Sequence, residues 1–179
     1  YRALGDWCAS NGLAWLATAH HADDQAETLL MRLARGAGLS GLAGVRRSRP
    51  LRPGVTLIRP LLDWRKAELE EQARKAGLIA AQDPSNADPA YDRTAARALL
   101  AAAPWLAPTR LAHSAANLAE AEAALDWAAE RLFAQRADGA TLDPAGVPPE
   151  LLRRLVLRMF ASFGKTPRGP DLARLIAAL

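Results

Sequence analysis

Acidic, imidazole and amide side chains are concentrated in one short segment of the sequence, residues 18–28. If a helix begins there, Asp23 and Glu27 lie four residues apart on one face. Asp24 and Thr28 share the adjacent face. Carboxylates and an imidazole in this arrangement are able to converge on one cation, which is either Mg²⁺ on a nucleotide or a substrate ammonium. The segment is therefore predicted to be the edge of an active site.

The same residues also fit a simpler interpretation, a capped helix start with solvated acids. Acidic residues are common in the first turn of a helix, where the macrodipole favours negative charge. Two features favour the active site instead: the pair His20 and His21, and a glycine-dense stretch after the predicted helix. That stretch requires unusual backbone angles or close approach to another group, and it contains Gly36, Gly38, Gly41 and Gly44.

The elements around this segment predict an α/β fold. Residues 2–11 form an amphipathic helical pattern, and the apolar run 13–19 has the length of a buried strand. A second helix is predicted to run from about Asp23 to Gly36. Helix, strand, tight loop and helix are the order expected in a parallel α/β sheet. Because such sheets bind ligands at the carboxyl ends of their strands, the acids are expected at that edge.

The remainder of the chain predicts a short strand pair and then mostly helices. The strand pair is expected over 45–60, with a turn at Pro53–Gly54. A domain boundary is expected near 105–110, and the chain beyond it is predicted to be helical except for an irregular stretch with a β-arm at 140–142. The predicted helices are 64–76, 91–103, 109–136, 148–163 and 169–179.

The overall charge favours an anionic partner. The net charge is +4 and the pI is about 9.8, and nearly all basic residues are arginine, which makes bidentate contacts with phosphate. An Ala-, Arg- and Leu-rich composition also fits an origin in genomic base content, so charge alone leaves nucleic-acid binding open. No apolar run reaches the roughly 20 residues of a membrane span, and no leader-like segment is visible. A single cysteine, Cys8, argues against a disulfide framework, and a cytoplasmic enzyme is expected.

The stretch Ala19–Val45, AHHADDQAETLLMRLARGAGLSGLAGV, resembles a long motif of the tRNA(Ile)-lysidine synthetase family almost throughout. Arg59–Leu62 resembles the RPLL segment of that family, and Asp83–Asn86 resembles its DPSN element. The resemblance covers roughly residues 1–105. In the basic helix after the DPSN element, Thr94 stands where the family usually has asparagine. The other residues that match in this region are Asp88, Tyr91, Arg93 and Arg97.

The resemblance implies an N-type ATP pyrophosphatase fold, a Rossmann-like α/β layer of the PP-loop type. Residues 1–107 would form the carboxyl-terminal part of that domain, without its first strand and phosphate loop. Residues 108–179 would form a small all-helical domain that binds substrate or tRNA. Family members use ATP to adenylate the wobble cytidine of an isoleucine tRNA with a CAU anticodon, and free L-lysine then displaces AMP. The implied ligands are ATP, Mg²⁺, L-lysine and tRNA(Ile), and a homodimer is a candidate assembly.

The resemblance also implies roles for the polar residues. The catalytic acids, which would hold the α-amino group of lysine or Mg²⁺ and accept protons from the attacking amine, are Asp23, Asp24 and Glu27. A Mg²⁺ site would rest on Asp23 and Asp24. The residues that would line the substrate and ATP site are His21, Gln25 and Thr28. Those that would contact phosphate or tRNA, although each also fits a solvated surface, are Arg32, Arg35, Arg93 and Arg97.

Three other classes of protein remain open on the residues alone. A tRNA thiolase relies on several cysteines, which the single Cys8 argues against. A metal-dependent phosphohydrolase needs further His and Asp clusters, but the only histidine beyond the His20–His21 pair is His113. A non-catalytic RNA-binding module, built from the helical half and the arginine surplus, predicts binding that falls steeply with salt and survives Asp23→Asn.

The resemblance implies a phosphate loop of the SGGxDS type after the first strand, and this loop is absent from the sequence. Ser40–Gly41 and Gly36–Gly38 do not follow such a strand and lack the aspartate. The chain is therefore expected to be an amino-terminally truncated form of the enzyme. We predict that these residues by themselves do not turn over ATP, because the loop that grips the phosphates in the family is not among them. Incubating the 179-residue chain with ATP, lysine and tRNA, followed by nucleoside mass spectrometry, tests this. Detectable lysidine would contradict the prediction.

Overall fold

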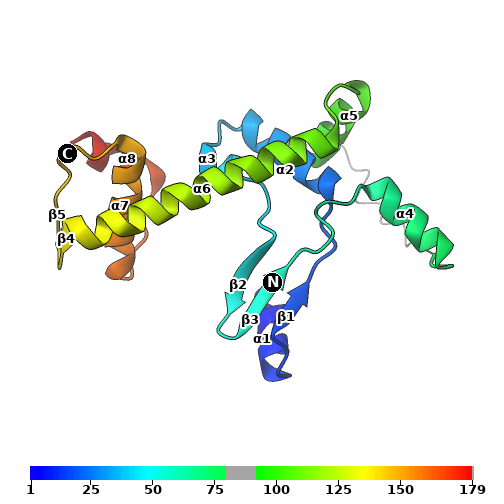
Figure 1. Cartoon of the computed structure of the whole chain (residues 1–179), viewed down its shortest axis with the longest axis horizontal. Helices are drawn as coiled ribbons and strands as arrows, with labels where there is room; N and C mark the ends of the chain where they lie inside the picture. Colours follow the sequence, from blue (N-terminus) through cyan, green and yellow to red (C-terminus); the bar gives the residue numbers. More distant parts are fainter. Residues whose placement is uncertain (80–91, 179) are drawn as a thin grey trace. The chain divides into compact units, whose positions relative to one another are not determined.

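The computed structural model describes residues 1–79 and 92–178, which form two compact units. Unit 1 comprises Tyr1–Ala119, and unit 2 comprises Glu120–Leu179. The long helix α6, Pro108–Arg136, carries the chain from one unit into the other (Figure 1). The domain boundary expected between residues 107 and 108 falls at the start of α6 and stays a prediction.

Unit 1 contains a small mixed sheet made of β1 (Trp15–Ala17), β2 (Ser48–Arg52) and β3 (Val55–Ile58). The strand order is β1-β3-β2, with β1 parallel to β3 and β2 antiparallel to β3. The antiparallel pair turns at Gly54, whose φ of +75° suits glycine, and it confirms the expected strand pair. The parallel pair confirms an α/β arrangement and brings the carboxyl ends of β1 and β3 to one edge.

The expectation that the apolar run 13–19 forms a buried strand is wrong in one respect. A strand is present, but Trp15 is 62% exposed and its two strand neighbours are not buried either. The physical reason is that β1 has only three residues and, among the described residues, pairs with β3 alone, so its side chains have a neighbouring strand on one side only. Helix α1 (Arg2–Ser10) packs on β2 through Gly5, which lies against the side chain of Leu51.

Helix α2 (Ala22–Ala34) begins shortly after β1, as the sequence predicts, with His21 as its N-cap. Ala26 and Leu29 are buried on this helix, which fixes it against the rest of unit 1. The glycine-dense stretch that follows is not all loop, because Leu39–Leu42 form one helical turn, α3.

Two further helices of unit 1 lie where they are predicted. They are α4 (Lys66–Lys75) and α5 (Asp92–Ala102). Helix α5 packs against α2 and buries Ala96. Several residues that carry the family resemblance lie outside the described residues, namely Asp83–Asn86, Asp88 and Tyr91.

Helix α2 holds the end of the glycine-dense stretch through its backbone. The Gln25 amide donates to the Val45 carbonyl at 2.8 Å and accepts the Val45 N–H at 2.6 Å. Gly44 has a φ of +66°, and a Cβ at this position would lie 2.6 Å from Gln25 Oε1 and 3.1 Å from Cβ of Ala115 on α6. Only glycine therefore allows the chain to pass this close to both helices.

Unit 2 consists of the second part of α6, helices α7 (Pro149–Ser162) and α8 (Gly169–Ala177), and a short ribbon. The ribbon pairs β4 (Ala137–Asp138) with β5 (Thr141–Leu142), so this unit is not entirely helical and the expected β-arm is present. No helix in the described ranges is both long and apolar enough to cross a membrane. The core of unit 2 is formed by Leu152, Val156 and Leu172.

A buried arginine joins α6 to α7 inside unit 2. Arg154 is 5% exposed and donates to Glu122 at 2.6 Å, to Asp126 at 2.5 Å and to Glu150 at 2.9 Å. Burial lowers the pKa of Arg154, but these hydrogen bonds outweigh burial and raise the pKa above its ordinary value. Removing one partner of a buried ion pair costs about 3–5 kcal/mol. The cluster therefore fixes the packing of α7 on the second part of α6.

Replacing Gly44 with alanine is expected to destabilise the protein more than replacing Gly54 with alanine. Both glycines have a positive φ, +66° at Gly44 and +75° at Gly54. Of these two positions, only Gly44 has other atoms of the described residues within 4 Å of an added Cβ. The left-handed backbone costs roughly 1–2 kcal/mol in both variants, and the collision with Gln25 and Ala115 adds about 1–3 kcal/mol. Urea unfolding of the two variants measures the difference. Equal free energies of unfolding would contradict the close packing at Gly44.

Candidate active site

The amino-terminal turn of α2 is bonded to the segment that starts α4. The Ala22 N–H donates to the Trp64 carbonyl at 2.9 Å. The Asp23 carboxylate accepts hydrogen bonds from Arg65 Nε at 3.1 Å, from Arg65 Nη2 at 3.0 Å and from the Lys66 backbone N–H at 2.8 Å. Since Lys66 is the first residue of α4, Asp23 lies at the positive end of that helix dipole.

The surroundings of Asp23 keep it ionised. Burial raises the pKa of its carboxyl, but the hydrogen bonds from Arg65 and from the Lys66 N–H, with the charge of Arg65, outweigh burial and hold the pKa below the ordinary 3.8. A general base works best with a pKa near the pH of the reaction. Asp23 is therefore suited to holding a cation and poorly suited to accepting a proton.

His21 and Asp24 form a capping box at the start of α2. The Asp24 N–H donates to His21 Nδ1 at 3.3 Å, and the His21 N–H donates to Asp24 Oδ2 at 3.0 Å. Because Nδ1 accepts, the neutral ring carries its proton on Nε2, which lies 3.4 Å from Asp24 Oδ2. His21 and Asp24, which the sequence analysis predicts to be site residues, therefore stabilise the start of α2.

Glu27 is buried between two arginines of α5. Its exposed fraction is 3%; Arg97 Nε donates to Oε1 at 2.7 Å, and Arg93 Nε lies 3.2 Å from Oε2. The Arg93 contact is an ion pair without a hydrogen bond, because Oε2 has no hydrogen-bond partner among the described residues. One buried carboxylate oxygen is therefore able to accept a further donor.

Asp23 and Glu27, four residues apart on α2, face one pocket of about 470 Å³, which we call the acid pocket. Cationic side chains line it beside the two carboxylates, and apolar residues from the end of α5 and the segment before α6 complete its wall. Opposite charges thus meet in a space large enough for a small substrate. The lining residues are Asp23, Glu27, Arg65, Lys66, Arg97, Leu100, Ala101, Pro104, Leu106, Ala107 and Pro108.

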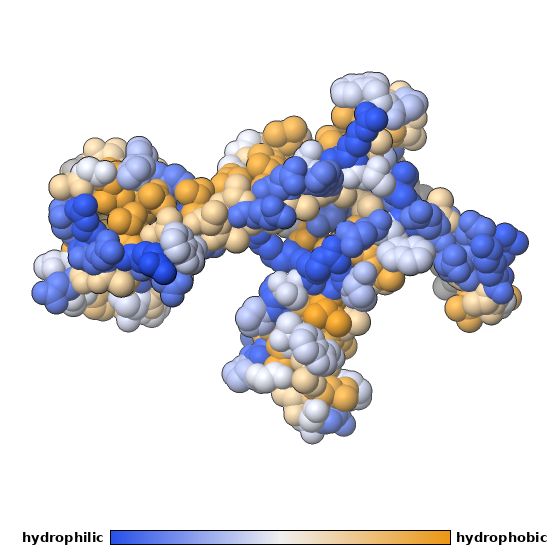
Figure 2. Space-filling view, in the orientation of Figure 1, coloured by the Kyte–Doolittle hydropathy of each residue, from blue (hydrophilic) through white to orange (hydrophobic). Residues whose placement is uncertain are grey.

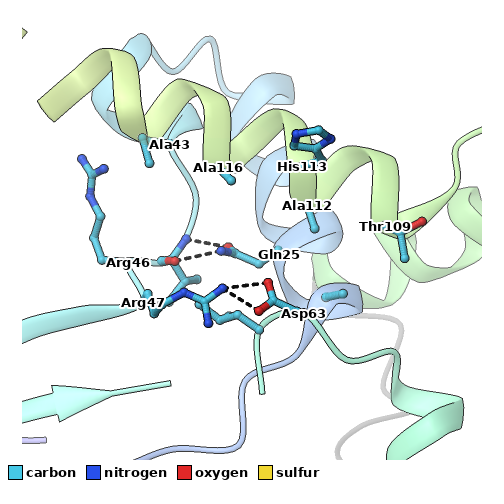
Figure 3. Close-up of a pocket in the computed structure, with 13 residues that line it drawn as sticks. Gln25, Ala43, Arg46, Arg47, Asp63, Thr109, Ala112, His113 and Ala116 are labelled. Atoms are coloured by element: carbon cyan, nitrogen blue, oxygen red, sulfur yellow. Dashed lines mark hydrogen bonds and ion pairs between the residues drawn. The ribbon is translucent and has the colours of Figure 1, made fainter. Parts of the chain in front are cut away.

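A second pocket of about 380 Å³, which we call the alanine pocket, lies in unit 1 beside α6 (Figure 3). Gln25 is part of its wall, so the structure separates this residue from the acids expected to share a site with it. Figure 3 shows the Gln25 amide across from α6, with the ion pair of Arg47 and Asp63 close by. The lining residues are Ala22, Gln25, Ala43, Val45, Arg46, Arg47, Leu62, Asp63, Thr109, Ala112, His113, Ala116 and Ala119.

The remaining predicted site residues have partners elsewhere in unit 1. Arg32 donates to the carbonyls of Gly41 and Gly44 at 2.6 and 3.1 Å, so it holds the glycine-dense stretch. Arg35 forms an ion pair with Asp92 at the start of α5. Thr28 is buried within α2.

The acids do not fit a ready-made Mg²⁺ site. Both oxygens of Asp23 accept hydrogen bonds from Arg65, and Asp24 Oδ2 accepts the His21 N–H. Residues 1–79 and 92–178 contain no group of three His, Cys, Asp or Glu side chains that could hold a metal ion. Mg²⁺ requires near-octahedral oxygen coordination, which these two engaged carboxylates do not supply.

His20 and Arg59 follow the carboxyl ends of the parallel strands β1 and β3. His20 belongs to the segment predicted to edge the site, but the sequence analysis assigns no role to either residue. Burial lowers the pKa of His20, and the positive charge of Arg59 lowers it further. Arg59 is 5% exposed, its Nη1 donates to the Arg46 carbonyl at 2.6 Å, and its Nε has no hydrogen-bond partner among the described residues. Ligands bind at the carboxyl ends of parallel strands, so polar residues that follow such a strand are site candidates. Applied to the predicted strand before residue 60, this rule would also have found Arg59.

The face of unit 1 drawn in Figure 2 carries hydrophilic and hydrophobic residues side by side.

Comparison with known proteins relates the chain to one family. Residues 1–103 match the family model of a PP-loop domain. Over its whole length the chain is similar to relatives named tRNA(Ile)-lysidine synthase, at 50% identity in Novosphingobium aromaticivorans, 42% in Zymomonas mobilis subsp. mobilis and 43% in Ruegeria pomeroyi. The matches cover 57%, 57% and 45% of those relatives, so the chain spans about half the length of the curated relatives it matches.

Replacing Arg65 with glutamine is expected to raise the pKa of Asp23 and to destabilise the protein at neutral pH. The folded pKa of Asp23 lies below its unfolded value, so its stabilising effect is complete above about pH 4 and is lost as the pH falls through the folded pKa. Because Arg65 is 36% exposed, the loss at neutral pH should be about 1 kcal/mol or less.

Urea unfolding of wild type and Arg65→Gln as a function of pH measures this effect. The gap between the two proteins should narrow in acid, whereas Arg74→Gln, which alters an exposed arginine of α4, should show no pH-dependent gap. A gap for Arg65→Gln that stays constant with pH would contradict the role given to Asp23.

Proposed function

The chain belongs to the PP-loop domain family, and we propose that it is part of an enzyme that uses ATP to attach lysine to a cytidine of tRNA(Ile). A PP-loop domain implies the use of ATP. One observation carries the proposal: Asp23 and Glu27 share a pocket in a chain that is 50% identical, along its whole length, to a relative named tRNA(Ile)-lysidine synthase.

The proposed reaction has two steps. In the first, the ring carbonyl oxygen of the wobble cytidine attacks the α-phosphorus of ATP, an O–P bond forms and pyrophosphate leaves. In the second, an uncharged amine of L-lysine attacks the activated ring carbon, the bond from that carbon to the oxygen of AMP breaks, and the nitrogen loses one proton. Adenylation is needed because it turns a poor leaving group into a good one.

The two carboxylates of the acid pocket are proposed to bind the amino groups of lysine. Asp23 already holds one guanidinium and Glu27 holds two, and a lysine ammonium is a cation of the same charge. We assign Asp23 to the α-amino group of lysine, because its lowered pKa keeps the carboxylate ionised. We assign Glu27 to accept the proton of the attacking amine, because its Oε2 lacks a hydrogen-bond donor among the described residues. Asp24 acts as a positioning residue through the cap it forms with His21.

The arginines of α5 are proposed to guide phosphate groups toward the acids. Arg93 and Arg97 are 45% and 36% exposed while they hold Glu27, so both guanidinium groups reach solvent beside the acid pocket. Arg35, whose side chain is 63% exposed, is proposed to contact tRNA. Arg32 is proposed to act only by holding the glycine-dense stretch, since two backbone carbonyls engage it.

The other implied ligands and the location complete the proposal. Mg²⁺ is proposed to accompany ATP as the counter-ion of its triphosphate, without a site on Asp23 and Asp24. A cytoplasmic location is proposed because tRNA is the substrate. The homodimer stays a prediction.

Two other functions fit the structure less well, and the comparisons support neither. The RNA-binding module would combine the helical half with the arginine surplus, but residues 108–179 contain nine basic and eight acidic residues, and unit 2 within them contains eight of each. The net charge of +4 therefore belongs to unit 1. A two-metal phosphohydrolase needs a cluster of ligands, and the described part of the chain contains no such cluster.

We predict that Asp23→Asn and Glu27→Gln, made in the full-length enzyme that contains this chain, each reduce lysidine formation by roughly 10²-fold or more. Asparagine and glutamine keep the shape of the side chain but remove the charge that holds the ammonium or accepts the proton. Mass spectrometry of the tRNA nucleosides measures the product, and circular dichroism with thermal unfolding checks the fold.

Glu71→Gln is the matched control, because Glu71 is an exposed acid of α4 that pairs only with Lys75 among the described residues. This variant should form lysidine at the wild-type rate. Normal lysidine formation by a folded Asp23→Asn or Glu27→Gln variant would overturn the assignment of the acid pocket.

A further inference from the structure

The chemistry proposed for the acid pocket uses no residue of the alanine pocket, yet the alanine pocket has the properties of a binding site. Helix α6 lines it with Ala112, Ala116 and Ala119, which recur at helical spacing and extend for about 10 Å along one face. Leu62 and Val45 add to this apolar surface. The volume of about 380 Å³ lies in the range of pockets that take small organic ligands.

Close packing at one point keeps the pocket open beside it. Ala115 is fully buried, and its Cβ lies 3.1 Å from the position that a Cβ on Gly44 would take. This contact places α6 directly against the end of the glycine-dense stretch. The neighbouring positions on the same face of α6 are alanines, whose small side chains leave the space of the pocket unfilled (Figure 3).

The rim of the pocket is cationic. Arg46 and Arg47 line it, and residues 44–62 contain five arginines and no acid. Buried Arg59 donates to the Arg46 carbonyl and has no carboxylate within ion-pair distance among the described residues, so its charge adds to the positive potential behind the rim. Arg47 pairs with Asp63, but both side chains are more than half exposed, and such pairs exchange readily for a stronger anion.

The polar groups of the pocket face the apolar surface. Gln25 uses one N–H and one oxygen lone pair on Val45, which leaves a second N–H and a second lone pair on the same amide. His113 and Thr109 of α6 lie at the other side of the opening (Figure 3). Donors and acceptors thus surround a surface that suits a flat ring.

We infer that the alanine pocket binds a nucleotide, with its ring on the alanines of α6 and its phosphate at the rim formed by Arg46 and Arg47. An apolar ligand would make no use of the arginines, and a free anion would make no use of the apolar surface. A nucleotide combines a flat ring, polar ring edges and an anion. The inference rests on the proposed function, which offers two sources for this ligand: ATP, or a nucleotide of tRNA turned out of its stack.

The test follows the ring signals of His113 by NMR, which is practical because the chain has three histidines. The whole chain is titrated in separate arms with ATP, with an RNA anticodon stem-loop and with inorganic phosphate. We expect ATP or the stem-loop to shift the His113 signals in a saturable way, and phosphate to shift them little. The arm that produces the shift identifies the source of the nucleotide.

Two pairs of variants locate the binding. Ala116→Leu places a larger side chain into the pocket and should weaken nucleotide binding by about tenfold or more. Ala121→Leu makes the same chemical change at an exposed position further along α6, outside the residues that line the pocket, and should bind as wild type. Arg47→Gln should weaken binding and lower its salt dependence by about one charge, whereas Arg74→Gln on α4 should change neither.

The inference is overturned if neither ATP nor the stem-loop shifts the His113 signals, if inorganic phosphate shifts them equally, or if Ala116→Leu and Ala121→Leu bind alike. These outcomes are separate from the failure of the proposed function. If the Ala116→Leu variant of the full-length enzyme forms lysidine with an unchanged KM for ATP and for tRNA, the nucleotide site is rejected and the proposed function is kept. If the nucleotide shifts the His113 signals but the full-length enzyme forms no lysidine, the nucleotide site is kept and the proposed function is rejected.

Discussion

The arrangement of unit 1 depends on how the buried polar side chains of α2 are satisfied. A buried polar group without a partner costs free energy, and a buried charge costs more. Gln25 therefore binds the backbone of Val45, Glu27 binds the arginines of α5, and Asp23 binds the start of α4. One helix thus fixes three segments that are far apart in the chain, and none of them is able to shift without leaving a polar group of α2 unpaired.

These same interactions determine what each pocket is able to bind. In the acid pocket both carboxylates are engaged with guanidinium groups. Under the proposed function, the lysine ammonium would replace one positive partner with another, and the buried charge would stay paired. In the alanine pocket the side chain from α2 is the uncharged amide of Gln25, which is hydrogen-bonded to the backbone of Val45. The charge of this pocket lies on the arginines of its rim. Two environments of different polarity therefore arise from neighbouring residues of one helix.

The two units also differ in what stabilises them. Unit 1 carries the whole net positive charge of the chain and both pockets, and its sheet is small and partly exposed. Unit 2 has balanced charge, and the buried guanidinium of Arg154 ties α6 to α7 through carboxylates of both helices beside the apolar core. A neutral unit built in this way suits a structural or positioning part better than electrostatic attraction of RNA, because long-range attraction depends on net charge.

Local pattern was enough to predict most helices, the hairpin at Pro53–Gly54 and the position of the polar segment 20–28 after a strand, because those features depend on neighbours in the sequence. The partners of that segment were beyond such reasoning: Arg65 lies 42 residues from Asp23, and Arg97 lies 70 residues from Glu27. Nothing in the sequence around His113 indicates a binding site, and this residue lines a pocket only because α6 packs beside Gly44. Sequence spacing determined which residue types share a face of α2, whereas only tertiary packing decided which pocket each side chain meets, since burial and pairing of charge depend on segments that the chain brings together from far apart.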